Sequence, residues 1–282
     1  MQIAAMNQPP LTIRSATNAD KAAVLAFCAA TWNGGDYIAD VWDTWLHDRA
    51  GALLVGVQAD QPVALAHVAL HDDEAWFEGL RVAPHLRGQG VGRRMIERSV
   101  DAARQRGATV LRLLTNRTNA AMMHLLPRIG FDHCFDAAWH SASAIAGSDQ
   151  FESPADLDTL IAQASDSSWI AAMNGLYASG WQFVTLTPMR VQAHLQRRQI
   201  VQVSGAGWAI VMPDGESDQP AIALAVGDVP RVLAALRSHP TAQQHGSIRA
   251  LLPLKGTSAQ HAISAGYTVG SHVFSVYEHP LR

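Results

Sequence analysis

A short glycine-rich segment carries the clearest chemical signal in the sequence. It reads Arg87-Gly88-Gln89-Gly90-Val91-Gly92, and it follows Pro84, which breaks the strand-like run before it. A turn of this kind presents the backbone N–H groups that the first turn of the following helix leaves without partners. Glycine lets the backbone approach a ligand closely, and the helix dipole adds positive potential at the same place. The segment therefore predicts a phosphate site, to which Arg87 and Arg93 can add charge-assisted contacts.

The spacing of the glycines excludes two common phosphate-binding motifs and matches a third. A P-loop needs lysine and then serine or threonine after its last glycine, where this sequence has Arg93 and Arg94. A dinucleotide-binding loop needs Gly-x-Gly-x-x-Gly, a spacing that these alternating glycines do not have. The pattern Arg87-x-x-Gly90-x-Gly92, behind a strand and opening a long helix, resembles motif A of the GNAT superfamily of N-acetyltransferases. In that family the motif cradles the pyrophosphate of acetyl-CoA.

The resemblance covers about Leu11 to His140 and includes two further stretches. They are EGLRVAP, which ends at Pro84, and Asn119-x-x-Met122-x-x-Leu125, which closes on Gly130-Phe131. The resemblance implies an α/β (α+β) fold, in which helices flank a mixed, mostly antiparallel central sheet. It also implies acetyl-CoA as the acetyl donor and a small-molecule or peptide amine as the acceptor. The cofactor-binding residues that it implies are Leu80, Arg81, Val82, Arg87, Gly88, Gln89, Gly90, Val91, Gly92, Arg93 and Asn119.

The resemblance also implies how the arm of the cofactor is held. In the family, the strand that corresponds to Leu80–Val82 splays from its neighbour, and its backbone bonds the pantetheine arm. Asn119 would contact that arm near the gap. A backbone N–H at Val82 or its neighbour would stabilise the negative charge that develops on the acetyl oxygen.

Acetyl transfer to an amine needs a group that removes a proton from the attacking nitrogen. Glu78 is the best candidate, because it lies two residues before Leu80 on the strand that would face the thioester. Glu78 could instead orient the ammonium group, or be an ordinary acid on a strand face. The tyrosine that commonly protonates the leaving thiolate in the family would fall at Leu126, which has no proton to donate. Tyr37, solvent or another group would then supply that proton.

The predicted order of elements up to Trp139 agrees with the resemblance. Helices are expected from Asn18 or Asp20 to about Ala30, over 37–48, from the glycine-rich turn to Gly107, and over 119–129. Strands are expected over 11–16, 52–58, 63–71, 74–82, 110–114 and 131–139, and the second, third and fourth of them form an antiparallel meander.

The segment around the second helix is rich in tryptophan and aspartate. Trp32, Trp42 and Trp45 are expected in the core, with the apolar wall of the acceptor pocket as the alternative. The acids of this segment are expected on a solvated face, with attraction of a cationic amine as the alternative. They are Asp36, Asp40 and Asp43.

A polar segment, Ser141 to Ser153, is expected to link the first half to a second unit. The second unit should hold strands at 200–203, 208–212, 221–226, 248–252 and 273–278, and helices that begin at Pro188 and run over 229–238 and 258–265. Its last strand, helix and strand repeat the order seen at the end of the first half, with Gly266-Tyr267 standing where Gly130-Phe131 stands. We therefore expect two GNAT copies in tandem, a cofactor-binding domain at 11–145 and a degenerate domain at 152–282. The second copy lacks the phosphate loop and has Gly227-Asp228-Val229-Pro230 at the equivalent place.

Composition sets limits on other functions. Hydrophobic residues make up 48% and charged residues 16%, which excludes disorder over most of the chain. A net charge of −3 argues against binding to nucleic acid or an anionic membrane. The 13 histidines and two cysteines show no metal-binding spacing, so no metal is expected. We expect a soluble cytoplasmic acetyl-CoA-dependent N-acetyltransferase, with a homodimer left open. The alternative is a non-catalytic acetyl-CoA-binding sensor or interaction protein.

Overall fold

The computed structural model describes residues 9–29, 35–147, 149–215 and 217–281, and it divides into two compact units. The first unit comprises Met1–Leu113, His124–Asp132 and Glu278–Arg282. The second comprises Leu114–Met123 and His133–Tyr277. Each unit therefore contains segments that are distant in the sequence. The assignment of one domain to 11–145 and another to 152–282 stays a prediction.

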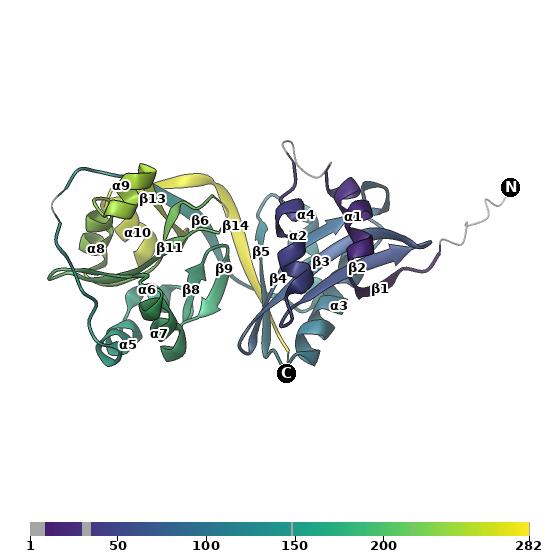
Figure 1. Cartoon of the computed structure of the whole chain (residues 1–282), viewed down its shortest axis with the longest axis horizontal. Helices are drawn as coiled ribbons and strands as arrows, with labels where there is room; N and C mark the ends of the chain where they lie inside the picture. The colour runs from purple at the N-terminus through teal and green to yellow at the C-terminus, as the bar shows by residue number, and fades with distance from the viewer. Residues whose placement is uncertain (1–8, 30–34, 148, 216, 282) are drawn as a thin grey trace. The chain divides into compact units, whose positions relative to one another are not determined.

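The sheet of the first unit has the order β1-β2-β3-β4-β5 (Figure 1). Its first four strands, β1 (Thr12–Ser15), β2 (Ala52–Gln58), β3 (Gln61–His71) and β4 (Glu74–Val82), pair antiparallel, whereas β5 (Val110–Asn116) runs parallel to β4. The parallel connection passes through α3 (Val91–Gln105). The predicted meander and the mixed, mostly antiparallel sheet are thus confirmed.

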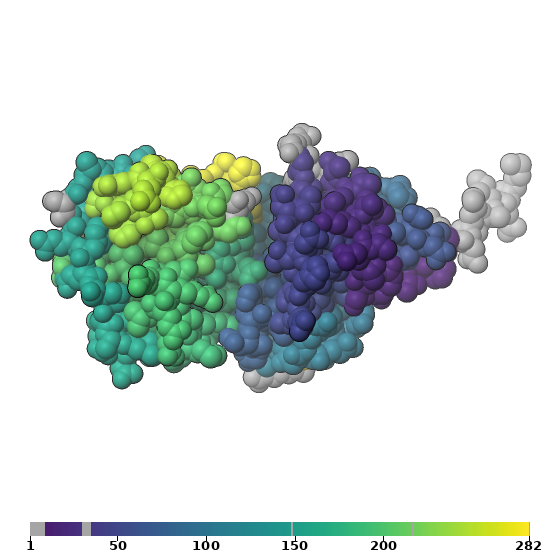
Figure 2. All heavy atoms as spheres, in the orientation of Figure 1, coloured from purple at the N-terminus to yellow at the C-terminus, as the bar shows by residue number. Residues whose placement is uncertain are grey.

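Helices cover both faces of this sheet because its strands alternate between two apolar layers. The helices α1 (Lys21–Cys28) and α2 (Ile38–His47) bury Trp42 and its neighbours against Leu53, Val55 and Leu65 of the strands. Gly56 of β2 faces the other way, since a Cβ added there would lie 3.2 Å from the sulfur of Met95 on α3. In the space-filling view, α1 and α2 form the surface of the first unit that faces the reader (Figure 2).

One predicted helix is split. The run expected over 119–129 forms α4 (Ala120–Leu125) and then a 3₁₀ turn, Leu126–Ile129. Pro127 explains the change, because proline has no N–H to continue the α-helical bonding. A single 3₁₀ turn, Asn18–Asp20, precedes α1, and another, Pro84–Leu86, follows β4.

The second unit holds a larger sheet with the order β14-β6-β13-β12-β11-β10-β7 and a separate hairpin, β8-β9. The strands are β6 (Asp132–Ser143), β7 (Phe151–Glu152), β8 (Leu176–Ser179), β9 (Gln182–Thr185), β10 (Ile200–Val203), β11 (Gly207–Pro213), β12 (Pro220–Gly227), β13 (Ser247–Pro253) and β14 (Thr268–Pro280). The helices are α5 (Leu157–Ser165), α6 (Ser168–Ala172), α7 (Pro188–Gln196), α8 (Val229–Leu236), α9 (Pro240–His245) and α10 (Thr257–Ser264).

The predicted linker is shorter than expected. Ser141–Ser143 extend β6 and pair with Ser247–Arg249 of β13, and Phe151–Glu152 form β7 against β10. Only residues 144–150 therefore connect β6 and β7. The polar composition of the segment concealed these strand ends, because backbone pairing does not require apolar side chains.

The pairing pattern of the second unit repeats that of the first. The strands β10, β11 and β12 pair antiparallel, and β12 then pairs parallel with β13 after a crossover that contains α8. The first unit has the same succession in β2, β3, β4 and β5, with α3 in the crossover. This repeat supports the proposal that the chain arose by duplication.

Candidate active site

The glycine-rich segment forms a left-handed turn that opens α3. Gly88 and Gly90 have φ values of +75° and +80°, a region that residues with a Cβ rarely adopt. A Cβ on either glycine would meet no atom within 4 Å, so the backbone conformation and not crowding selects glycine here. Gly90 is the N-cap of α3, and no side chain caps this helix end. Backbone N–H groups at an uncapped helix N-terminus with open space before them fit a phosphate group.

Two side chains of the loop donate to backbone carbonyl oxygens of the residues that precede it. The Nε of Arg87 donates to the backbone carbonyl oxygen of Val82 (3.1 Å). The side-chain amide of Gln89 donates to the backbone carbonyl oxygen of His85 (2.9 Å). Arg93 forms an exposed ion pair with Glu97 one helical turn on (2.7 Å). The structure thus brings the predicted loop residues together at the start of α3.

The end of β4 lies beyond its parallel pairing with β5. The paired register covers Glu74–Phe77 of β4 and Val110–Leu113 of β5, whereas β4 itself continues to Val82. The side chains of Leu80 and Val82 lie beside Gly92, each 3.9 Å from the position of an added Cβ. Strand residues 78–82 thus run past the end of the β4–β5 ladder toward the phosphate loop. This arrangement agrees with the expected splay.

A bulge in β4 determines which side chains face α2. His67 of β3 is paired with Glu78 and Leu65 with Arg81, so Gly79 and Leu80 together oppose one residue of β3. Gly79 has a φ of +68°, and a Cβ there would overlap the ring of Trp45. Strict alternation would direct side chains 78 and 81 to opposite faces, but the extra residue brings both to the same face.

Arg81 is held in a buried ion pair on this face. Its Nε and Nη2 donate to the two oxygens of Asp36 at 2.6 and 3.0 Å, and the Asp36 side chain is only 2% exposed. The ring of Tyr37 lies 5.2 Å from the guanidinium carbon. Burial alone would lower the pKa of Arg81, but the bonds to Asp36 outweigh it and the pKa is raised. The expectation that Asp36 lies on a solvated face is therefore wrong.

Glu78 lies near the same cluster and bonds a histidine. Its Oε1 is 2.9 Å from Nδ1 of His67, and its side chain is 22% exposed. Trp45 stacks on His67, with ring centroids 4.5 Å apart, and Tyr37 meets the edge of Trp45. The arrangement places a carboxylate, a phenol and aromatic walls on one face of β4. Such a surface can bind an amine and accept its proton.

The remaining residues of this segment have structural roles. Trp42 and Trp45 are buried, which confirms the prediction for them, while Trp32 falls outside the described residues. Asp40 is exposed, and Asp43 pairs with Lys21 at the surface (2.9 Å). Burial raises the pKa of the Cys28 thiol to about 12, so this cysteine stays protonated at neutral pH and is no nucleophile.

Asn119 and Leu126 complete the set of predicted positions. The side-chain oxygen of Asn119 accepts from the backbone N–H of Met122 at the start of α4 (3.3 Å). Asn119 belongs to the second unit, and its contact with the cofactor stays a prediction. Leu126 is fully buried in the first unit.

Two functional candidates were missed in the sequence: Asp48 and His67. The available signal was His67 itself, an imidazole in the middle of an otherwise apolar run, residues 63–70. Its pairing with Glu78 follows from the tight turn at Asp72–Asp73, because the register that begins with His71 opposite Glu74 continues without a shift to His67.

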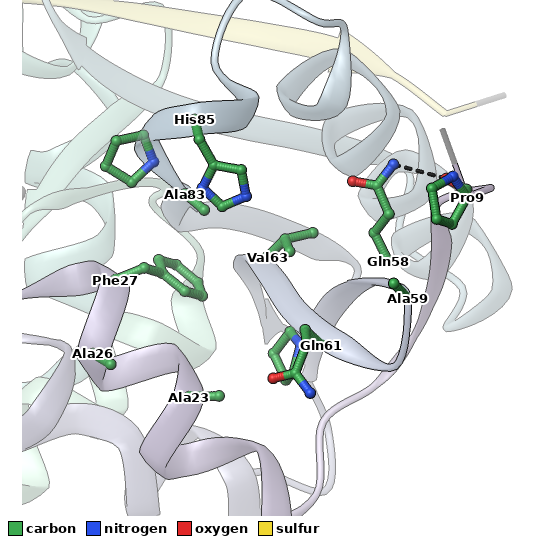
Figure 3. Close-up of a pocket in the computed structure, with 12 residues that line it drawn as sticks. Pro9, Ala23, Ala26, Phe27, Gln58, Ala59, Gln61, Val63, Ala83 and His85 are labelled. Atoms are coloured by element: carbon green, nitrogen blue, oxygen red, sulfur yellow. Dashed lines mark hydrogen bonds between the residues drawn. The ribbon is translucent and has the colours of Figure 1, made fainter. Parts of the chain in front are cut away.

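An apolar hollow of about 640 Å³ lies elsewhere on the first unit (Figure 3). Phe27 of α1, Val63 of β3 and Ala83 after β4 contribute to its wall. Among the described residues that line it, His85 is the only one with a titratable side chain. The hollow therefore offers shape rather than acid–base chemistry.

The second unit has a different group where the first has its phosphate loop. Asp228 follows β12 and caps α8, and its carboxylate accepts from the backbone N–H of Arg231 (3.3 Å). This side chain adds negative charge at the helix end, where a phosphate would need positive potential. Across the described parts of both units, no group of three or more histidine, cysteine or acidic residues is arranged to hold a metal. No helix in the described ranges is long and apolar enough to cross a membrane.

Comparison with known proteins places these features in context. The sequence model of the Acetyltransferase (GNAT) family matches residues 20–131. The chain is 36% identical over 106 residues to streptothricin acetyltransferase of Streptomyces lavendulae, which covers 36% of this chain and 55% of that protein. It is 29% identical over 136 residues to the L-amino acid N-acyltransferase MnaT of Escherichia coli (strain K12), covering 43% of this chain and 79% of that protein. The chain thus spans about half the length of the first of these relatives.

Two solved structures resemble the chain over most of its length. A GCN5-related N-acetyltransferase from Sphaerobacter thermophilus has a TM-score of 0.65 and 13% identity, covering 96% of each chain. A GCN5-related N-acetyltransferase from Kribbella flavida has a TM-score of 0.57 and 19% identity, covering 96% of this chain and 72% of the other. At these identities the likeness concerns the fold.

Proposed function

We propose that residues 20–131, which the Acetyltransferase (GNAT) family model matches, form an acetyltransferase domain, and that the protein transfers an acetyl group from acetyl-CoA to an amine. The observation that carries the proposal is the uncapped N-terminus of α3 behind the two left-handed glycines, Gly88 and Gly90. The carboxylate of Glu78 lies on the strand that leads to this loop. Together they supply an anion site and a base on consecutive parts of one chain segment.

The residues of the loop fit the pyrophosphate of acetyl-CoA. Space for it exists because a Cβ at Gly88 or Gly90 would meet nothing within 4 Å. The N–H groups at the start of α3 would bind its oxygens, and Arg87 and Arg93 would add charge. The backbone of Leu80–Val82 would hold the arm. The acetyl-CoA thioester supplies the activated acyl group when it is bound.

Glu78 is the proposed base. Its carboxylate would accept a proton from the ammonium form of the acceptor, so that the nitrogen lone pair can attack the acetyl carbon. A backbone N–H near Val82 would donate to the acetyl oxygen as its negative charge develops. The leaving thiolate takes a proton from solvent or from Tyr37, whose ring is 46% exposed beside Trp45.

The acceptor class follows from the same surface. Asp36 is already neutralised by Arg81, so Glu78 is the carboxylate of this cluster that can receive an amine. The relatives named for streptothricin and for L-amino acids suggest small primary amines as the first acceptors to test. An alternative is that the chain binds acetyl-CoA without turnover, which the leucine at position 126 would favour.

A thiol-release assay tests the proposal. The full-length protein is incubated with acetyl-CoA and a panel of amines that includes streptothricin, L-amino acids and a peptide with a free N-terminus. We expect saturable release of free thiol with at least one member, and acetylated product by mass spectrometry. Calorimetry that detects acetyl-CoA binding, with thiol release no faster than hydrolysis for the whole panel, would support the sensor alternative. Absence of acetyl-CoA binding would refute both.

A further inference from the structure

A buried histidine lies between two carboxylates beneath the proposed acceptor face. His67 on β3 has its Nδ1 2.9 Å from Oε1 of Glu78 and its Nε2 3.6 Å from Oδ2 of Asp48. Its side chain is 3% exposed, whereas that of Asp48 is 29% exposed. The three side chains thus form a line from Glu78 through the imidazole to Asp48.

Four features fix this line in place. The β3–β4 register pairs His67 directly with Glu78 across the strands. The indole of Trp45 stacks on the imidazole, with an angle of 9° between the rings. Asp48 follows α2, and its Oδ1 accepts from the backbone N–H of Ala50 (3.0 Å). Gly51 leaves room for that carboxylate, since a Cβ there would overlap the Asp48 side chain.

The position of the protons on His67 follows from its neighbours. A carboxylate oxygen at 2.9 Å can only accept, so Nδ1 must carry a proton for this contact to be a hydrogen bond. Nε2 is buried and has no hydrogen-bond partner among the described residues, and Asp48 faces it from beyond hydrogen-bonding distance.

An apolar residue could fill this position and would avoid the cost of a buried nitrogen that lacks a hydrogen-bond partner. Packing alone therefore does not explain the histidine. We propose that His67 is the positioning residue for Glu78. Its Nδ1–H holds Oε1 of that carboxylate, while Asp48 lies on the opposite side of the ring. This inference rests on the proposed role of Glu78 as the base, and His67 acts only through that carboxylate.

The activity test compares two substitutions of His67 with a matched control. His67→Leu should lower kcat for the amine by up to about 100-fold, because a misplacement of the base by about 1 Å can cost this much, with little change in acetyl-CoA affinity. His67→Asn should recover most of the loss, because its side-chain N–H can replace Nδ1–H. His140→Leu is the control: His140 is also a fully buried strand histidine, it bonds the backbone of Ala138, and it belongs to the second unit.

A double-substitution cycle separates positioning from general destabilisation. In a Glu78→Gln background, His67→Leu should produce no further loss of kcat, because the group through which it acts is already disabled. Equal kcat for wild type and His67→Leu would overturn the proposal. So would an additive loss in the double variant, or failure of asparagine to recover activity that leucine loses.

A spectroscopic measurement tests the inference without an acceptor. Nitrogen-15 NMR of the imidazoles should show a protonated Nδ1 on His67 that shifts on Glu78→Gln and is unaffected by Asp40→Asn. An unprotonated Nδ1, or a signal indifferent to Glu78→Gln, would overturn the positioning role. Failure of the acetyl-transfer proposal would instead appear as absent thiol release with this NMR signature intact.

Discussion

Arg112 of β5 donates through Nε to Glu278, 166 residues further along the chain, at 3.1 Å. Its Nη1 donates at the same time to Glu74 of β4 at 2.6 Å, and Arg112 and Glu74 are both buried. Leu281 adds two backbone contacts, since its N–H donates to Thr109 (2.9 Å) and its carbonyl accepts from Arg104 (3.2 Å). The last described residues thus belong structurally to the unit that contains the proposed active site.

Deleting residues 278–282 should destabilise the first unit. The deletion removes the buried Leu281 side chain, its two backbone bonds and one partner of Arg112. We expect a loss of at least about 2 kcal/mol in the free energy of unfolding, measured by urea denaturation. The single change Glu278→Gln should cost about 1 kcal/mol or less, because that carboxylate is partly exposed. Equal stability of the deletion and the full chain would contradict this assignment.

The glycine turn allows a matched comparison. Gly90 and Gly107 stand at opposite ends of α3, have φ values of +80° and +83°, and face open space. Leucine at either position should cost about 1–2 kcal/mol of stability from the same backbone strain. Gly90→Leu should in addition weaken acetyl-CoA binding by roughly 100-fold or more, because the side chain enters the phosphate space. Comparable Kd values for the two variants in calorimetry would argue against this phosphate site.

Glu78→Gln should lower kcat/KM for the amine by about 10²–10⁴ while acetyl-CoA affinity stays nearly unchanged. The glutamine amide has nearly the same shape as the carboxylate, but at neutral pH it cannot take a proton from the substrate amine. Asp40→Asn, on the exposed side of α2, is the control and should have no effect. A pH–rate profile that is identical in wild type and Glu78→Gln would remove Glu78 from the mechanism.

Calorimetry should find one acetyl-CoA site per chain. Among the residues that the structure describes, the two left-handed glycines with flanking arginines occur in the loop before α3, while Asp228 caps the corresponding helix of the second unit. Gly90→Leu should then weaken all of the measured acetyl-CoA binding rather than half of it. A stoichiometry of two, or residual binding at half the original capacity, would mean that the second unit also binds the cofactor.

The Asp36–Arg81 pair should contribute strongly to stability because Asp36 is almost fully buried. Arg81→Met leaves that carboxylate without its ion-pair partner and should cost about 3–5 kcal/mol. Adding Asp36→Asn to Arg81→Met should recover part of the loss, since the buried charge is then gone. Lys21→Met tests an exposed pair, Lys21–Asp43, and should change stability by no more than about 1 kcal/mol. Additive losses at 36 and 81 would show that the pair is not coupled.

Local patterns were enough to predict the loop, the meander and most strands of the first unit. The phosphate loop depends on glycines and arginines at fixed short spacings, and the strands depend on runs of apolar residues. Between Phe151 and Thr185 the sequence predicted no elements, although two helices and three short strands lie there. These elements are too short for a clear period, and their stability comes from burial, as for Trp169 and Phe183.

The charged half of the site could not be predicted in this way. The pairing of Asp36 with Arg81 joins different elements and depends on the bulge at Gly79, whereas the hairpin register itself places His67 opposite Glu78. A shift of one residue would direct Arg81 to the other face of the sheet. Sequence reasoning therefore identified Glu78 correctly as a strand residue. It missed His67, which bonds Glu78, and the ion pair of Asp36 with Arg81.

The division of β14 also has a consequence for synthesis on the ribosome. The first unit includes everything up to Leu113 but also Glu278–Arg282, so its last segment emerges only after the whole second unit has been translated. At about 5–20 residues per second, the interval between these two segments is roughly 10–30 s. During this time Arg112 lacks Glu278, and the pocket for Leu281 is empty. A nascent chain that stalls within the second unit would therefore contain the glycine-rich loop but lack the last segment of the first unit. We expect chaperones to bind such a chain.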